Sequence, residues 1–194
     1  MNSVKSQTGG AGIGRFLLGL LQILLYPRRG WEDAGKDNYE GKYLLARGLV
    51  PLLIVVALSS LCGFFYYGSV SLFDSLAQGI LDFTGYFVSV YICEYLLSWG
   101  LKRWVFPMRW SQNKITTFVV YSVASMAVMT FLNNAFPADL ALLSFLPLYV
   151  IYILWGGVEY MSVPEGRKAH FLAVSLGTVF MPPYLLSYCM SLFL

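Results

Sequence analysis

The sequence predicts an all-α membrane protein, a polytopic transmembrane helical bundle of five spans with an amphipathic interfacial helix at its N-terminus. Of its 194 residues, 58% are hydrophobic and only 12% are charged, whereas about 25% of the residues of a soluble domain are charged. Apolar segments recur along the chain, each close to the roughly 20 residues that a helix needs to cross a bilayer. The Lys and Arg residues fall only in alternate connections between these segments, which is typical of helices threaded through a membrane.

The first 42 residues are expected to lie at the membrane surface and not to cross it. Residues 1–12 are polar and rich in glycine, which predicts a flexible tail. From residue 13 the apolar positions follow the spacing i, i+3, i+4, i+7, i+8, i+11 of an amphipathic helix: Ile13, Phe16, Leu17, Leu20, Leu21 and Leu24. A helix over residues 13–26 would be about 21 Å long, too short to span. We expect it to lie in the cytoplasmic interface and to end at Pro27.

The rest of the 13–42 domain is a mixed-charge segment that is expected to face water and lipid headgroups. Arg28, Arg29 and Lys36 are its candidate residues for docking on a membrane surface, because each basic residue near anionic headgroups contributes roughly 1 kcal/mol. Trp31 is expected to anchor the same segment in the interface. The predicted partner is therefore the lipid bilayer, with other membrane proteins as further candidates. Nucleic-acid binding is not expected, because the basic residues are dispersed along the chain and form no continuous basic patch.

Residues 43–194 are predicted to form the five-helix transmembrane domain. The spans are expected at about 47–67, 70–98, 115–136, 140–161 and 171–193, and Pro182-Pro183 is expected to kink the last one. The connections before the first span, after the second and after the fourth hold seven, four and two basic residues, which accounts for all 13. This distribution places the N-terminus in the cytoplasm and the C-terminus on the opposite side.

Polar residues within the second span form a candidate intramembrane site. Asp74, Gln78 and Asp82 are spaced i, i+4, i+8, and small side chains continue close to the same face at Gly85, Ser89 and Cys93. Charge in hydrocarbon is costly and usually lines a bundle interior or a wet cavity. Because no Lys or Arg falls at the depth of Asp82, two interpretations stay open. Asp82 is either an ion or proton site in a cavity or a protonated carboxyl that holds two helices together.

Glu94 completes the candidate set and lies near the cytoplasmic end of the same span. Basic residues of the neighbouring connections are within reach, so an interfacial ion pair is expected there.

Enzyme signatures are absent: His170 is the sole histidine, and the chain has no Walker loop, G-x-S-x-G or H-E-x-x-H motif. No enzymatic activity, cofactor or metal is therefore expected.

Short motifs occur along the chain in a recognisable order. Tyr26-Pro27 and Trp31 form a P-x-x-x-W arrangement, Pro147-Leu148-Tyr149-x-x-Tyr152 leads to Gly156-Gly157, and Lys168-Ala169 precedes the last span. In this layout the chain resembles the bacterial branch of the Yip1 family of five-span membrane proteins. The resemblance implies a five-helix topology, a bacterial inner membrane with the C-terminus in the periplasm, and a non-catalytic role. Eukaryotic relatives associate with prenylated Rab GTPases, but this chain lacks their D-L-Y-G-P motif, so Rab binding is not expected.

Two functions follow from these observations. The leading hypothesis is a non-enzymatic protein that organises membrane or partner proteins through its amphipathic helix and the basic loops beside it. The alternative is a small ion, proton or solute transporter or channel that uses Asp82. Five spans are few for a monomeric transporter, and no inverted repeat is visible between the halves of the chain. A homo-oligomer could supply a pore.

Overall fold

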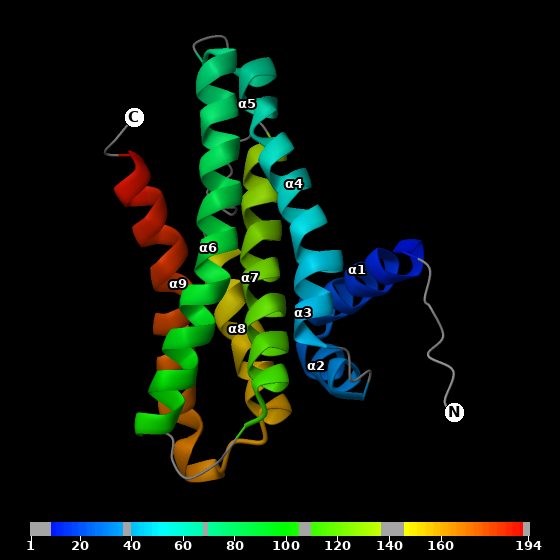
Figure 1. The fold of residues 1–194 in the computed structure, drawn as a ribbon, viewed down its shortest axis with the longest axis vertical. Helices are drawn as coiled ribbons and strands as arrows, with labels where there is room; N and C mark the ends of the chain where they lie inside the picture. Colours follow the sequence, from blue (N-terminus) through cyan, green and yellow to red (C-terminus); the bar gives the residue numbers. More distant parts are fainter. Residues whose placement is uncertain (1–8, 37–39, 68–69, 105–109, 137–145, 192–194) are drawn as a thin grey trace.

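Long helices run side by side through the structure, and two shorter helices lie against one end of them (Figure 1). The structure, a computed structural model, describes residues 9–36, 40–67, 70–104, 110–136 and 146–191. Every regular element within these ranges is a helix, which confirms the all-α class. Of the predicted tail, residues 1–8 lie outside the described ranges.

The described residues contain four helical stretches that are long and apolar enough to cross a membrane: Gly41–Tyr66, Leu72–Leu101, Gln112–Ala135 and Glu165–Leu186. The first consists of consecutive pieces, namely α3 (Gly41–Leu44), a π-helical turn (Leu45–Leu49), α4 (Val50–Ser59) and α5 (Leu61–Tyr66). The others belong to α6 (Leu72–Trp104), α7 (Gln112–Ala135), and a 3₁₀ turn (Glu165–Arg167) that leads into α9 (Lys168–Ser191). They correspond to the first, second, third and fifth predicted spans.

The predicted fourth span is described only in part. Its helix, α8, covers Leu146–Tyr160, and residues 140–145 of the prediction lie outside the described ranges. The apolar stretch within it, Leu148–Tyr160, is shorter than a full span. The fourth predicted span, and with it the total of five crossings, therefore stays a prediction.

The N-terminal segment is more helical than the sequence predicts. Helix α1 begins at Gly9, four residues before the predicted start, and runs to Leu25. The charged segment is also helical and forms α2 (Pro27–Lys36). Pro27 separates the two because proline is favoured in the first turn of a helix and cannot continue the preceding one. The two helices cross at Gly30, where a Cβ would lie 2.5 Å from the backbone nitrogen of Ile23.

Helix α7 is the core of the bundle and contacts α1, α3, α4, α6 and α8. Its side chains are buried without a break from Ile115 to Ala127, because a helix that is apolar all round can be packed on every side. The hydroxyls of Ser122 and Ser125 donate to backbone carbonyls one turn earlier, at 2.7 and 2.8 Å. These polar groups are therefore satisfied without another helix.

Helices α6 and α9 pack closely along the small-residue face predicted for the second span. Ser89 and Cys93 are fully buried, and the Cys93 thiol donates to the carbonyl oxygen of Thr178 on α9 at 2.9 Å. Small side chains let two helix backbones approach closely. Helix α9 continues through Pro182 and Pro183, and its C-terminal part leads away from α6 (Figure 1).

We expect Gly30→Ala to separate α1 from α2 and to lower the free energy of unfolding by roughly 1–3 kcal/mol, the usual cost of overpacking. Gly177→Ala on α9 is the matched control, because a Cβ there meets nothing within 4 Å. It should leave stability unchanged or raise it slightly, since alanine favours helix more than glycine does. Thermal unfolding of both variants in detergent measures the difference. Equal melting temperatures would contradict the tight crossing at Gly30.

Candidate functional site

Trp31 is buried inside the protein and not in the membrane interface. Only 1% of it is exposed, and its indole Nε1 donates to the carbonyl oxygen of Ile153 on α8 at 2.9 Å. The prediction that Trp31 anchors the segment in lipid is therefore wrong. The indole finds both its apolar surroundings and its hydrogen-bond acceptor within the chain, because α2 lies directly on α8.

Two adjacent glycines of α8 make room for this indole. A Cβ on Gly156 would lie 3.2 Å from Cδ1 of Trp31, and one on Gly157 would overlap the ring of Phe118. The ring of Phe118 stacks on the indole and the ring of Tyr160 lies tilted against it, each with its centroid 5.2 Å away. The P-x-x-x-W and Gly-Gly motifs, far apart in the sequence, thus form a single contact, which we call the Trp31 contact. A second bond supports it, from the Tyr149 hydroxyl to the carbonyl oxygen of Leu24 at 2.7 Å.

Helix α1 presents three different edges, and the inner one packs on the bundle. Phe16, Leu20 and Ile23 are buried there. The Phe16 ring stacks on Tyr121 of α7 at 5.3 Å and covers Gly48, where a Cβ would overlap it. Gly48 belongs to the π-helical turn of the first span, and such turns are often found at functional positions.

The outer edge of α1 is apolar and uncovered. Leu17, Leu18, Leu21 and Leu25 are 44%, 67%, 51% and 61% exposed. The predicted apolar face is therefore divided, since Phe16 and Leu20 face the protein while Leu17 and Leu21 face outward. Leucines exposed in one row on a membrane protein are suited to contact with lipid.

The third edge of α1 is polar and is bonded to α2. The Gln22 amide and the Lys36 ammonium both donate to Asp33, the latter at 2.9 Å. These bonds, first that from Lys36 and then that from Gln22, hold the pKa of Asp33 below its usual value, and Asp33 in turn raises the pKa of Lys36. Ionised Asp33 thus ties the two helices together.

The predicted docking cations lie on the exposed side of α2. Arg28, Arg29 and Lys36 are all exposed. Arg28 approaches Glu159 of α8 at 3.7 Å, with both side chains more than half exposed, and such a pair contributes little. The structure therefore presents these three cations on the surface while it turns Trp31 inward.

Asp74, the first residue of the predicted intramembrane set, lies in the first turn of helix α6. Its backbone N–H donates to the Ser71 hydroxyl at 3.1 Å, and its carboxylate accepts from the backbone N–H and the hydroxyl of Ser71 at 3.3 and 2.7 Å. This reciprocal pattern is a capping box, with Asp74 at its third helical position. Asp74 is thus an exposed residue at the helix end, not a deep one.

Asp82 is held by three neutral donors from different parts of the bundle. Gln78, one turn earlier on α6, donates to it at 2.9 Å. The hydroxyl of Ser60, between α4 and α5, and the amide of Asn134 on α7 lie at 3.4 and 3.5 Å from its other oxygen. The two long bonds are near the geometric limit. All three donors are hydroxyl or amide groups, so none of them brings a positive charge to Asp82.

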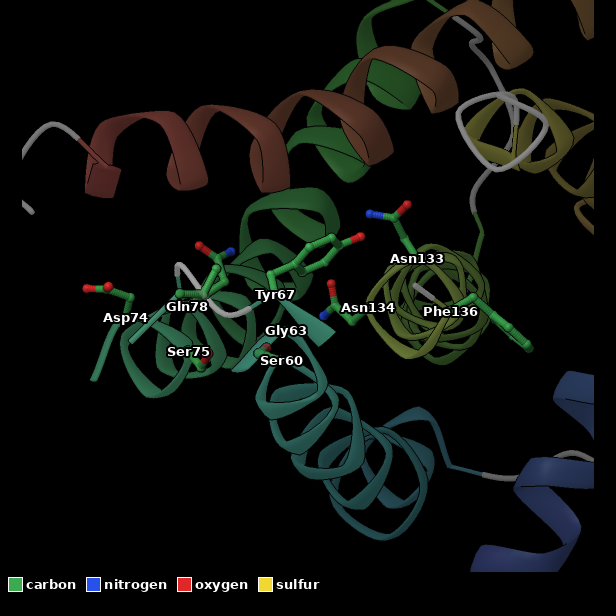
Figure 2. A pocket seen from close by; sticks show the side chains of 10 residues that line it. Ser60, Gly63, Tyr67, Asp74, Ser75, Gln78, Asn133, Asn134 and Phe136 are labelled. Carbon is green, nitrogen blue, oxygen red and sulfur yellow. The ribbon is translucent and has the colours of Figure 1, made fainter. Parts of the chain in front are cut away.

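Two cavities lie near Asp82, and Asp82 itself lines one of them. The outer cavity, about 420 Å³, lies between α5, the start of α6 and the end of α7, and is lined by Ser60, Gly63, Tyr67, Val70, Asp74, Ser75, Gln78, Asn133, Asn134 and Phe136. Figure 2 shows Tyr67 and Asn134 close together in it, with Asp74 at its edge. A smaller cavity of about 120 Å³ is lined by Asp82 itself and by Tyr86, Thr130, Pro183 and Tyr184 among others. The donors of Asp82 thus line one cavity, and Asp82 is among the residues that line the other.

Glu94 lies at the opposite end of α6 and does not make the expected ion pair in the described part of the chain. Its Oε1 accepts from the Gln112 amide and from the Thr116 hydroxyl, the latter at 2.6 Å. Both donors are neutral and belong to the first turns of α7. Gln78 and Asp82 are therefore bonded to each other in the structure, Asp74 lines the same cavity as Gln78, and Glu94 lies apart from all three.

Sequence reasoning missed the polar partners that come from other spans. Ser60 and Asn134 bond Asp82, and the Tyr86 hydroxyl pairs with Thr130 at 2.6 Å. The pair Asn133-Asn134 could have predicted such a partner, since two amides in an apolar helix usually face the bundle interior. Within the described ranges, no group of three His, Cys, Asp or Glu residues could hold a metal ion.

The family resemblance predicted from the short motifs agrees with a comparison of the chain with protein-family models. No curated protein and no solved structure matches the chain. A family model described as the Yip1 domain matches residues 21–186. The match includes α2, the four long helical stretches and the Gly-Gly turn of α8. The chain is therefore an integral membrane protein that belongs to the Yip1 family.

Proposed function

We propose that this protein is non-enzymatic and organises the membrane around it, and partner proteins at that face, by holding α1 as a fixed interfacial helix. The observation that carries the proposal is the row of exposed leucines on α1, at positions 17, 18, 21 and 25. The opposite edge of the same helix is buried against the bundle. The helix is thus fixed to the protein and apolar toward its surroundings.

The dimensions of α1 support a position in the plane of the membrane. Its 17 residues extend about 26 Å, less than the hydrocarbon thickness of about 30 Å. In Figure 1 it points sideways from the bundle and does not run along the long helices. A helix in this position would place its leucines among the acyl chains of one leaflet and displace the lipids there.

The charge distribution supports a cytoplasmic position for this helix. The ends of α6 and α9 that carry Arg103 and Lys168 lie at the same end of the bundle as α2 (Figure 1). Arg28 and Arg29 are exposed on α2 beside α1, and basic residues near anionic headgroups contribute roughly 1 kcal/mol each. We infer that this end faces the cytoplasm, with the C-terminus in the periplasm of a bacterial inner membrane.

Replacing both Leu17 and Leu21 with Glu should withdraw α1 from the lipid while the spans stay folded. Wild-type protein reconstituted in liposomes should give smaller vesicles than the double Glu variant at equal protein-to-lipid ratio, since an inserted helix expands one leaflet. Vesicle diameters from cryo-electron microscopy measure this.

The matched control is Leu17→Met with Leu21→Met, which keeps both positions apolar. It should give vesicles of wild-type size. Equal diameters for the wild type and the double Glu variant would contradict the proposed function.

A second function is favoured by the surroundings of Asp82, which lines one cavity while its hydrogen-bond donors line another, and we propose this function as the alternative. A small transporter or channel needs a polar group at membrane depth that water or an ion can reach. Asp82 has such surroundings, with polar side chains on the outer side and the Pro183 region of α9 on the other. Its donors are neutral, so a cation or proton would find an acidic group without a competing Lys or Arg among the described contacts.

If this alternative holds, Asp82→Asn should reduce proton or small-cation flux into proteoliposomes by at least about tenfold, because the site loses its charge. Asp74→Asn is the control: it removes the carboxylate that lines the outer cavity but keeps an oxygen for the capping box. It should leave flux unchanged. Flux that is equal in wild type and Asp82→Asn, or no higher than in empty liposomes, would exclude Asp82 from transport.

A further inference from the structure

A cleft near the C-terminal end of α6 combines one carboxylate with exposed aromatic rings. Its volume is about 420 Å³, and it is lined by Tyr91, Glu94, Tyr95, Ser98, Trp99 and Gln112. All but Gln112 come from α6, and Gln112 begins α7. The cleft is far from the outer cavity, which lies at the other end of α6, and neither proposed function uses it.

Glu94 gives this cleft a negative charge. Its side chain is half-buried, and Oε1 accepts from Gln112 and Thr116. Because both donors are neutral, they stabilise the carboxylate without cancelling its charge. The ion pairs recorded among the described residues involve other carboxylates, those of Asp33, Glu159 and Glu165.

The aromatic walls are arranged for a cation. Tyr91, Tyr95 and Trp99 are spaced i, i+4, i+8 and therefore form one stripe along α6, with 52%, 71% and 50% of each residue exposed. The face of an aromatic ring carries partial negative charge and attracts an ammonium group. Glu94 and the rings thus favour the same kind of ligand, whereas an anion would be repelled by both.

The position of the cleft along the bundle suggests where that cation comes from. Glu94 lies level with the first turns of α7, since it accepts hydrogen bonds from residues 112 and 116. The ends of spanning helices are where lipid headgroups and aromatic belts meet. A cation present there at high local concentration is the ammonium of a zwitterionic lipid.

We propose that the cleft binds the ethanolamine headgroup of phosphatidylethanolamine, with its ammonium against the Glu94 carboxylate and between the rings of Tyr91, Tyr95 and Trp99. A primary ammonium has three N–H donors. The cleft offers oxygen acceptors for them on Glu94, on the Ser98 hydroxyl and on the side-chain carbonyl of Gln112. A trimethylated headgroup has no N–H to donate, so the site should prefer ethanolamine to choline.

The test is native mass spectrometry of the full chain incubated with phosphatidylethanolamine, its mono-, di- and trimethylated forms, and phosphatidylglycerol. The wild type should retain phosphatidylethanolamine best, with retention falling as methyl groups are added and lowest for phosphatidylglycerol. Glu94→Gln should reduce its retention by at least about fivefold, the loss expected when a charge-assisted contact becomes neutral. The amide still offers an oxygen to Gln112 and Thr116, so the fold should persist.

Two further variants test whether the loss of lipid retention is specific to the cleft. Tyr95→Leu should reduce retention about threefold through loss of a cation–π contact, and since Tyr95 is 71% exposed its replacement should not alter the fold. Glu159→Gln removes an exposed carboxylate of α8 and should retain the lipid as the wild type does. Equal retention by the wild type and both cleft variants would overturn the proposal. Preferential retention of the trimethylated lipid, or of phosphatidylglycerol, would overturn it as well.

Discussion

The insertion of Trp31 between α8 and α7 determines how the N-terminal segment is attached to the membrane domain. The glycine pair leaves space for the indole at this point, because a Cβ on Gly156 or Gly157 would lie 3.2 or 3.3 Å from the indole, and the one on Gly157 would also overlap the ring of Phe118. The indole is held by the stacked ring of Phe118, by the tilted ring of Tyr160 and by one hydrogen bond to a backbone carbonyl. Burial of so large a side chain, with its polar atom satisfied, is among the strongest local contributions that a protein can make.

The other features of the N-terminal segment depend on this contact. With α2 fixed on α8, the crossing at Gly30 and the bonds of Asp33 fix the direction of α1. That direction determines which leucines are buried and which are exposed. An amphipathic helix on a flexible linker could take many orientations, whereas α1 is held at one angle to the bundle by these contacts. The proposed membrane function therefore rests on a packing contact inside the protein and not on the charged surface alone.

The class of fold, four of the spans and the helical periodicity of α1 could be predicted from the sequence, because apolar length and spacing are local properties. The burial of Trp31 could not be predicted, since a tryptophan among charged residues is equally typical of an interface anchor, and only the position of Gly156-Gly157 decides between burial and anchoring.

The helical start of α1 was also missed: glycine disfavours helix, yet Gly12 lies directly against Tyr43 of α3, where a larger residue would not fit. For Asp82 the i, i+4 neighbour Gln78 was predictable, but Ser60 and Asn134 come from other parts of the bundle, and their register depends on its packing.

The most direct test of this account is hydrogen–deuterium exchange of Trp31→Ala in lipid nanodiscs, with Trp155→Ala as the control. Trp155 lies on α8, the helix against which Trp31 packs, but is 47% exposed. Loss of the Trp31 contact should remove roughly 3–5 kcal/mol of packing, so the amides of residues 9–36 should exchange at least about tenfold faster while those of α6 and α7 stay protected. The control should match the wild type. Unchanged protection of α1 and α2 in Trp31→Ala would contradict the claim that this contact holds the N-terminal segment on the bundle.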